Sequence, residues 1–183
     1  IIALTGTASR AVLKDVMTEL ELNQLSDPVI KPKSFDRSEL NFWIRTGKND
    51  QEINSLAKAA FDELPKQLKI SRSELYSTNG NKTFSGLVFG PHVNGDHGIR
   101  KNQQMVHSLT NADVNIFSGS CPKGMNFQTW EDEKRRFALD FKENKVPILV
   151  ATKAFGMGID KPNIRYTLHL GIPSSLEGFY QEA

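Results

Sequence analysis

Apolar positions along the chain follow two periods, and each period predicts a different kind of element. Short apolar runs bounded by Gly, Pro or polar residues are typical of buried strands. Apolar positions spaced three and four residues apart are typical of helices that cover a sheet. The first pattern predicts strands at 1–4, 40–45, 86–90, 112–119, 146–152 and 163–172. The second predicts helices at 10–20, 51–68, 96–109 and 126–145, and a final helix after Ser174 or Ser175.

Two of these helices carry well-defined apolar stripes. Pro65 is expected to end the helix at 51–68 or to kink its last turn, because proline has no main-chain N–H. In the helix at 126–145, the expected inward-facing residues are Phe127, Trp130, Phe137 and Phe141. The segment 69–85 is polar and contains the turn pair Asn79-Gly80, so we predict that it is a mobile insertion.

Strands alternate with helices through nearly the whole chain. Alternation of this kind requires crossover connections, which make the strands parallel and place helices on both faces of the sheet. The predicted fold class is therefore α/β, a three-layer arrangement around a mostly parallel sheet.

Composition narrows the class of protein further. The net charge of +2 is too small to argue for nucleic acid by itself. A single cysteine, Cys121, excludes an intrachain disulfide framework and indicates a reducing compartment. The four histidines and this cysteine show no spacing typical of a metal site, so no metal ligands are predicted. No apolar run is long enough to span a bilayer, and no membrane partner is expected.

Several short motifs occur in a characteristic order. They are ALTGTAS, SFDRSEL, GLVFG, VATKAFGMGIDKPNIRYTLHLGIP and SSLEGFYQEA. In this order they resemble the RecQ family of ATP-dependent DNA helicases across essentially the whole chain. The segment 150–183 is the most specific part of the resemblance.

The resemblance implies a two-lobed motor in which both lobes are RecA-like, with ATP between the lobes and single-stranded DNA across both. Residues 1–34 would be the end of the first lobe, and residues 35–183 most of the second. The chain contains no G-x-x-x-x-G-K-[ST] phosphate-binding motif. The implied cofactor, ATP with Mg²⁺, would therefore be bound mainly by the first lobe, and this part of the protein would be inactive alone.

The resemblance also implies partners and a compartment. Single-stranded and duplex DNA are the expected partners, and the protein is expected to be a monomer. It would act in the cytoplasm at the bacterial nucleoid, or in the nucleus of a eukaryote.

Residue roles follow from the matching motifs. On the ATP side the resemblance implies Gly158, Asp160 and Gln181, with the Asp160 carboxylate able to accept a hydrogen bond from a ribose hydroxyl; a cap of the turn is the alternative role. Asp36 and Arg37 match the hinge-region motif and would join the lobes, or would form an ordinary solvated turn. Contacts to DNA, or coupling of ATP to DNA, are implied for Thr5, Thr7, Thr152, Lys161, Gly119 and His92.

The chain also departs from the family pattern. The family's Cys-x-Ser-Arg is expected after the strand at 86–90, but Gly90, Pro91, His92 and Val93 stand where its Ser and Arg would be. His92 would then be a substitute donor, or an ordinary exposed loop residue. Phe155 is expected in the core, with stacking on a base as the alternative.

Three other functions compete with a RecQ-type helicase. A DEAD-box RNA helicase would carry A-R-G-x-D in place of AFGMGID. A motor-like domain that binds nucleic acid or a protein without catalysis is compatible with the altered segment 90–93. A Rossmann-type dinucleotide enzyme lacks support, because no Gly-rich turn follows the first predicted strand.

Overall fold

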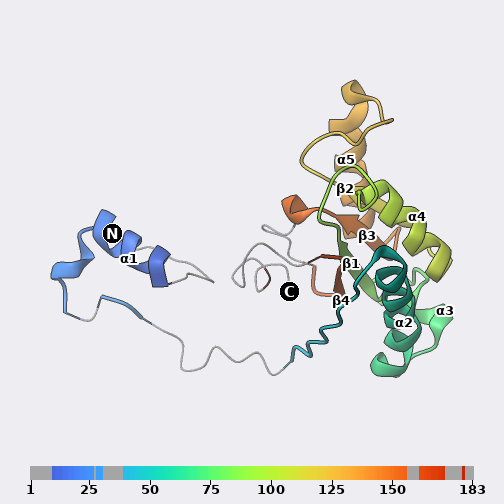
Figure 1. Ribbon diagram of the computed structural model, residues 1–183, viewed down its shortest axis with the longest axis horizontal. Helices are drawn as coiled ribbons and strands as arrows, with labels where there is room; N and C mark the ends of the chain where they lie inside the picture. Colours follow the sequence, from blue (N-terminus) through green and yellow to red (C-terminus); the bar gives the residue numbers. More distant parts are fainter. Residues whose placement is uncertain (1–9, 27, 31–38, 156–160, 172–178, 180–183) are drawn as a thin grey trace. The chain divides into compact units, whose positions relative to one another are not determined.

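The computed structural model describes residues 10–26, 28–30, 39–155, 161–171 and 179, and Figure 1 shows its elements. The chain divides into two compact units, residues 1–46 and 47–183. The first unit contains α1 (Arg10–Glu19) and a 3₁₀ turn, η1 (Leu22–Gln24). The predicted helix at 10–20 is therefore confirmed. The assignment of residues 1–34 to a first motor lobe stays a prediction.

The strand predicted at 40–45 is wrong. Residues 40–46 adopt no regular secondary structure, and the side chains of Trp43 and Ile44 are exposed. Alternating polarity is enough to suggest a strand, but a strand also needs a neighbour to accept its main-chain hydrogen bonds. The four strands that the structure describes pair only with one another.

The second unit is built on a parallel sheet. Its strands are β1 (Ser85–Phe89), β2 (Val114–Phe117), β3 (Ile148–Ala151) and β4 (Ile164–His169), in the order β2-β3-β1-β4. All three neighbouring pairs are parallel. β2, β3 and β4 lie inside predicted strands, and β1 begins one residue before the strand predicted at 86–90. The central strands β1 and β3 are buried along their whole length, which explains their continuous apolar sequences.

Helices cover both faces of this sheet. On one face, α2 (Asp50–Leu68) and α4 (Ile99–Thr110) pack on a core cluster that includes Val88 and Val150. On the other face, Phe141 of α5 (Phe127–Lys142) packs against Leu87 and Leu149. Neighbouring strand residues thus face opposite layers, and the predicted three-layer α/β fold is confirmed.

One inward position in α5 is wrong. Trp130 and Phe141 are fully buried and Phe137 is partly buried, as the apolar stripe predicts. Phe127 is instead 80% exposed. It is the first residue of the helix, directly after the N-cap Asn126. Helical spacing therefore identified the buried face of α5, but it did not show that the first turn of the helix extends beyond the core.

The segment 69–85 is folded and is not a mobile insertion. It contains a short helix, α3 (Arg72–Leu75), whose N-cap Ser71 accepts a hydrogen bond from the main-chain N–H of Glu74. Leu75, Tyr76 and Thr83 are buried although they stand among polar residues. One adjacent pair and a single threonine in a polar segment form no detectable period, so the sequence pattern could not indicate their burial.

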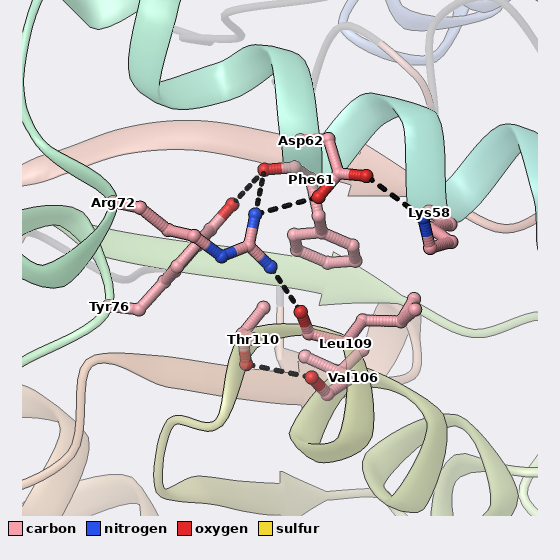
Figure 2. Close-up of polar contacts among 8 residues, drawn as sticks. All are labelled: Lys58, Phe61, Asp62, Arg72, Tyr76, Val106, Leu109 and Thr110. Carbon is pink, nitrogen blue, oxygen red and sulfur yellow. Dashed lines mark hydrogen bonds and ion pairs between the residues drawn. The ribbon is translucent and has the colours of Figure 1, made fainter.

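Arg72 ties this segment to two helices (Figure 2). Its Nη1 donates a hydrogen bond of 2.7 Å to the carboxylate of Asp62 in α2, and its Nη2 donates to the carbonyl of Leu109 in α4. Lys58 also bonds Asp62, and together these cations lower the pKa of the Asp62 carboxyl. Positively charged groups near a helix C-terminus also interact favourably with the free carbonyls there.

None of the helices within the described ranges combines the length and the apolar character needed to cross a lipid bilayer.

Candidate functional site

The carboxyl ends of the parallel strands meet at one edge of the sheet, where ligands bind in open α/β folds. We call this the carboxyl edge and define it by the residues that follow β1, β2 and β3. Gly90 and His92 follow β1, Gly119 follows β2, and Thr152 follows β3. The structure therefore brings three of the predicted DNA-contact residues, His92, Gly119 and Thr152, to the same edge.

Thr152 begins the turn at the end of β3 and is largely buried. Its main-chain N–H donates a hydrogen bond of 3.1 Å to the carbonyl of Phe117 in β2. Its own carbonyl accepts one of 3.0 Å from Phe155, which closes the 3₁₀ turn η2 (Lys153–Phe155). The Phe155 ring packs against Phe117 and Phe141, with ring centroids 4.8 and 6.1 Å away. The expected core position of Phe155 is confirmed.

Gly119 is exposed and lies beside this turn. A Cβ placed on Gly119 would be 3.6 Å from the Cβ of Ala154. The preceding residue, Ser118, is buried and donates a hydrogen bond of 2.6 Å to the carbonyl of Ser120. Gly119 and the turn after Thr152 thus follow adjacent strands and are close neighbours, and Gly119 is exposed.

The segment after β1 explains one departure from the family pattern. The N–H of Gly90 donates a hydrogen bond of 2.8 Å to the carbonyl of Ala151, which fixes its position. A Cβ on Gly90 would be only 2.7 Å from Nδ2 of Asn102 in α4. That amide is itself held by the carbonyl of His97, at 3.1 Å. A side chain at position 90 would therefore have to displace the end of the Asn102 side chain, which gives a local reason for glycine at this position.

His92 is exposed at the start of the loop 91–98, which leads into α4. Its carbonyl accepts a hydrogen bond of 3.1 Å from the N–H of Ile99, the first residue of that helix. The imidazole is thus available at the carboxyl edge, while the main chain of His92 is fixed. A phosphate contact by His92 stays a prediction.

Lys161 is not at this edge. It lies before β4, where its ammonium donates hydrogen bonds to Oδ1 of Asn144 at 2.5 Å and to the carbonyl of Lys142 at 3.3 Å. The same Nζ is 5.0 Å from the centroid of the Phe141 ring. Burial lowers the pKa of this amine, which is only 8% exposed as a residue. We therefore leave Lys161 out of the proposed DNA contacts.

Two aromatic contacts lie at the ends of β1 and β4. The ring of His169 stacks on Phe89 with centroids 4.9 Å apart, and it meets the ring of Phe179 edge-on at 5.0 Å. Burial lowers the pKa of His169, so its neutral form is favoured. His169 therefore serves as a packing residue between the end of the sheet and Phe179.

The remaining predicted site residues lie outside the described residues. They are Thr5, Thr7, Asp36, Arg37, Gly158, Asp160 and Gln181. Within the ranges that the structure describes, no group of three or more His, Cys, Asp or Glu residues is placed to hold a metal ion.

Sequence reasoning missed three polar residues beside the carboxyl edge, Asn94, Arg100 and Lys123. Asn94 and Arg100 both bond the main chain of Lys123, and so join the loop after β1 and the first turn of α4 to the loop after β2. The only available signals were the turn pairs Asn94-Gly95 and Lys123-Gly124, which indicate tight turns but not that two turns meet.

Comparison with known proteins places this geometry in a family. A family model described as "Helicase conserved C-terminal domain" matches residues 73–183. The chain is 30% identical over 99% of its length to the ATP-dependent helicase wrn-1 of Caenorhabditis elegans. It is 30% identical over its full length to the ATP-dependent DNA helicase RecQ of Bacillus subtilis. A protein of Acanthamoeba polyphaga mimivirus, provisionally named an ATP-dependent RNA helicase, is 31% identical over the full chain.

A solved structure supports the same fold. Dbp5 of Saccharomyces cerevisiae, bound to RNA and ADP BeF3, matches with a TM-score of 0.53 and 14% identity, over 97% of this chain and 39% of that one. The sequence relatives are much longer than this chain, which spans 14% of the Caenorhabditis protein, 25% of the Bacillus protein and 27% of the mimivirus protein.

Proposed function

The chain belongs to the family of the helicase conserved C-terminal domain, with RecQ-type relatives, and from this we propose that it is the second motor lobe of an ATP-dependent DNA helicase. The whole protein would couple ATP hydrolysis to the unwinding of duplex DNA. Residues 1–34 would be the end of the first lobe. The protein would act as a monomer, at the nucleoid or in the nucleus.

The observation that carries this proposal is the gathering of His92, Gly119 and Thr152 at the carboxyl edge. Small and polar residues at strand ends let a phosphate approach main-chain N–H groups closely. Contacts of this kind fix the position of a nucleic-acid backbone without reading its sequence. The proposed role of the edge is therefore to hold single-stranded DNA while the lobes move.

The proposed ATP contacts rest on the family motif. Gly158, Asp160 and Gln181 are the residues proposed for this chain's side of the nucleotide, and Asp36 and Arg37 for the contact between lobes. ATP with Mg²⁺ supplies the free energy of the cycle and would be bound mainly by the first lobe. Thr5 and Thr7 would relay the state of the nucleotide to the DNA side.

The direct test uses the full-length protein and the 183-residue chain side by side. The full-length protein is expected to unwind a DNA duplex with a single-stranded tail only when ATP and Mg²⁺ are present. The isolated chain is expected to hydrolyse no ATP, because phosphoryl transfer needs groups from both lobes. ATP hydrolysis by the purified chain, or a full-length protein without ATP-dependent unwinding, would overturn the proposal.

Asp160 provides a sharper test in the full-length protein. If its carboxylate bonds the ribose, Asp160→Ala should weaken nucleotide affinity or the rate of hydrolysis about ten- to a hundredfold. DNA affinity without nucleotide should stay the same. A variant with a lower melting temperature but unchanged ATP dependence would show that Asp160 only caps the turn.

RNA is the second candidate substrate, favoured by the mimivirus relative that is provisionally named an RNA helicase. The same unwinding assay with an RNA duplex of matched sequence decides between the two. If the protein prefers the RNA duplex, the proposal of an ATP-dependent motor stands, but its substrate is RNA and not DNA.

A further inference from the structure

We propose that Lys123 is a further contact to the phosphate backbone of the bound nucleic acid, held in place by Asn94 and Arg100. This inference rests on the proposed function of the carboxyl edge and names an additional binding residue there. Lys123 lies in the segment between Gly119 and α5, where the resemblance to known motifs is weak. Nothing in the motif pattern assigned it a role.

Both main-chain groups of Lys123 are fixed by side chains, one from the loop after β1 and one from α4. Its N–H donates a hydrogen bond of 2.7 Å to Oδ1 of Asn94, and its carbonyl accepts one of 3.0 Å from Nη1 of Arg100. Asn94 belongs to the loop after β1, and Arg100 to the first turn of α4. We call these two bonds the Lys123 latch. They leave the exposed ammonium side chain of Lys123 pointing from a fixed main chain.

Glycines make the latch possible. Gly124 has φ +81°, and a Cβ there would be 2.7 Å from Nη1 of Arg100, so any other residue would push the guanidinium away. A Cβ on Gly98 would be 2.7–2.9 Å from the main chain of Asn94 and Val93. Both glycines therefore have a steric reason: Gly124 leaves room for the Arg100 guanidinium, and Gly98 lets the loop 91–98 fold closely on itself.

The charges near the latch favour an anionic ligand. Among the described residues, the exposed cations on the loops of the carboxyl edge and on the first turn of α4 are Arg100, Lys101, Lys123 and Lys153. Lys101 forms an ion pair with Asp96, the acidic residue of the loop 91–98. Arg100 and Lys123 lie together through the latch, and Lys153 stands beside Ala154, the neighbour of Gly119. A phosphodiester backbone fits this arrangement, because its charges repeat along its length.

A fixed lysine differs energetically from an ordinary surface lysine. An exposed lysine must be ordered before it can hold one phosphate, and the lost conformational freedom offsets the attraction. Here the main chain is already ordered, so only the side chain has to be. The latch should therefore reduce the entropy lost on binding, so that more of the attraction between Lys123 and a phosphate contributes to DNA affinity.

The test measures binding of the full-length protein to a fluorescent single-stranded DNA as a function of salt. Lys123→Ala should raise the dissociation constant about two- to fivefold near 50 mM salt, as expected for one exposed charge contact. The slope of log affinity against log salt should become shallower by about 0.7, because one fewer phosphate is neutralised. Lys123→Arg should retain most of the wild-type affinity and most of the wild-type slope.

Lys82→Ala is the matched control. Lys82 is also exposed and stands just before β1, at the opposite edge of the sheet. Lys82→Ala removes the same charge as Lys123→Ala, but away from the carboxyl edge. It should therefore change neither the affinity for DNA nor the slope of log affinity against log salt. An equal effect of both variants would mean that binding follows only the net charge, and would overturn the assignment of Lys123.

Asn94→Ala tests the latch without changing any charge. It should lower affinity and slope in the direction of Lys123→Ala, and the double variant should be no weaker than Lys123→Ala alone. The kcat of ATP hydrolysis at saturating DNA should stay unchanged while the DNA concentration for half-maximal rate rises. If Asn94 had a purely structural role, Asn94→Ala would lower the melting temperature without raising the DNA concentration for half-maximal rate.

The outcomes separate the two proposals. If the wild-type protein binds and unwinds DNA but Lys123→Ala matches it in affinity and slope, the inference about Lys123 is wrong and the proposed function stands. If the wild-type protein binds neither DNA nor RNA, the proposed function itself fails. Additive effects of Asn94→Ala and Lys123→Ala would show that Asn94 does not act through Lys123.

Discussion

The hydroxyl of Tyr76 donates a hydrogen bond of 2.5 Å to the main-chain carbonyl of Phe61 (Figure 2). In a regular helix, that carbonyl would accept from the N–H of the residue four positions later, which here is Pro65. Proline has no N–H, so α2 continues to Leu68 with one of its carbonyls deprived of the helical donor. Tyr76, with a longer bond of 3.4 Å from Arg72, takes the place of that donor.

Removing this donor should destabilise the fold. We expect Tyr76→Phe to lower the free energy of unfolding by about 1–3 kcal/mol, because a buried carbonyl loses its short hydrogen bond. Urea denaturation of the 183-residue chain measures the change. In a Pro65→Ala background, where a main-chain donor is available again, Tyr76→Phe should cost clearly less. Equal costs in both backgrounds would show that the phenol stabilises only by packing.

Gly86 is expected to tolerate no side chain. It pairs with Tyr166 of β4, and a Cβ at Gly86 would be 2.0–2.4 Å from three atoms of the Tyr166 ring. Gly86→Ala should therefore destabilise the chain by about 1–3 kcal/mol or more, because the ring cannot move within a packed core. Thermal unfolding followed by circular dichroism would measure the loss.

The control removes the ring. Tyr166→Val should cost stability by itself, but Gly86→Ala should add little to it. If Gly86→Ala costs as much in the Tyr166→Val protein as in the wild type, the tight contact is not the reason for glycine at this position.

Truncating two aromatic residues of α5 should lower the free energy of unfolding by very different amounts. Phe127→Ala is expected to change the free energy of unfolding by less than about 0.5 kcal/mol, because the ring is 80% exposed. Trp130→Ala should cost about 3–5 kcal/mol, because the indole is fully buried in the core. Chemical denaturation of both variants compares them directly. A large loss for Phe127→Ala would mean that its ring is buried in solution.

His169 should make the fold sensitive to mild acid. Burial lowers the pKa of its imidazole below the ordinary value of 6.5, so near and below that pH the unfolded chain binds more protons than the folded one. Stability from this group is therefore complete above about pH 6.5 and falls as the pH decreases. The melting temperature should drop more between pH 7.5 and 5.5 in the wild type than in His169→Phe.

The choice of variant matters in this experiment. His169→Phe retains a ring between Phe89 and Phe179 but does not titrate. His92, His97 and His107 are present in both proteins, so the comparison isolates the contribution of His169. An equal drop in both proteins would show that His169 is not the group responsible.

The sequence by itself determined the fold class and most of the elements. The helical stripe of α2 and the continuous apolar runs of β1 and β3 depend only on residues close in the chain. Such local periodicity follows directly from helix and strand geometry. The motif around Thr152 likewise identified the family, because its residues are consecutive. The strand at 40–45 shows the limit, since its pattern was present but its pairing was not.

Only the tertiary structure decided which distant residues meet. It buried Leu75 and Tyr76 within a polar segment, and it turned Lys161 toward Asn144 and away from the carboxyl edge. It also joined Asn94 to Lys123 across 29 positions of sequence. These contacts depend on the strand order β2-β3-β1-β4, which brings separate loops together. No local pattern encodes that order, because it results from the burial of all the apolar faces at once.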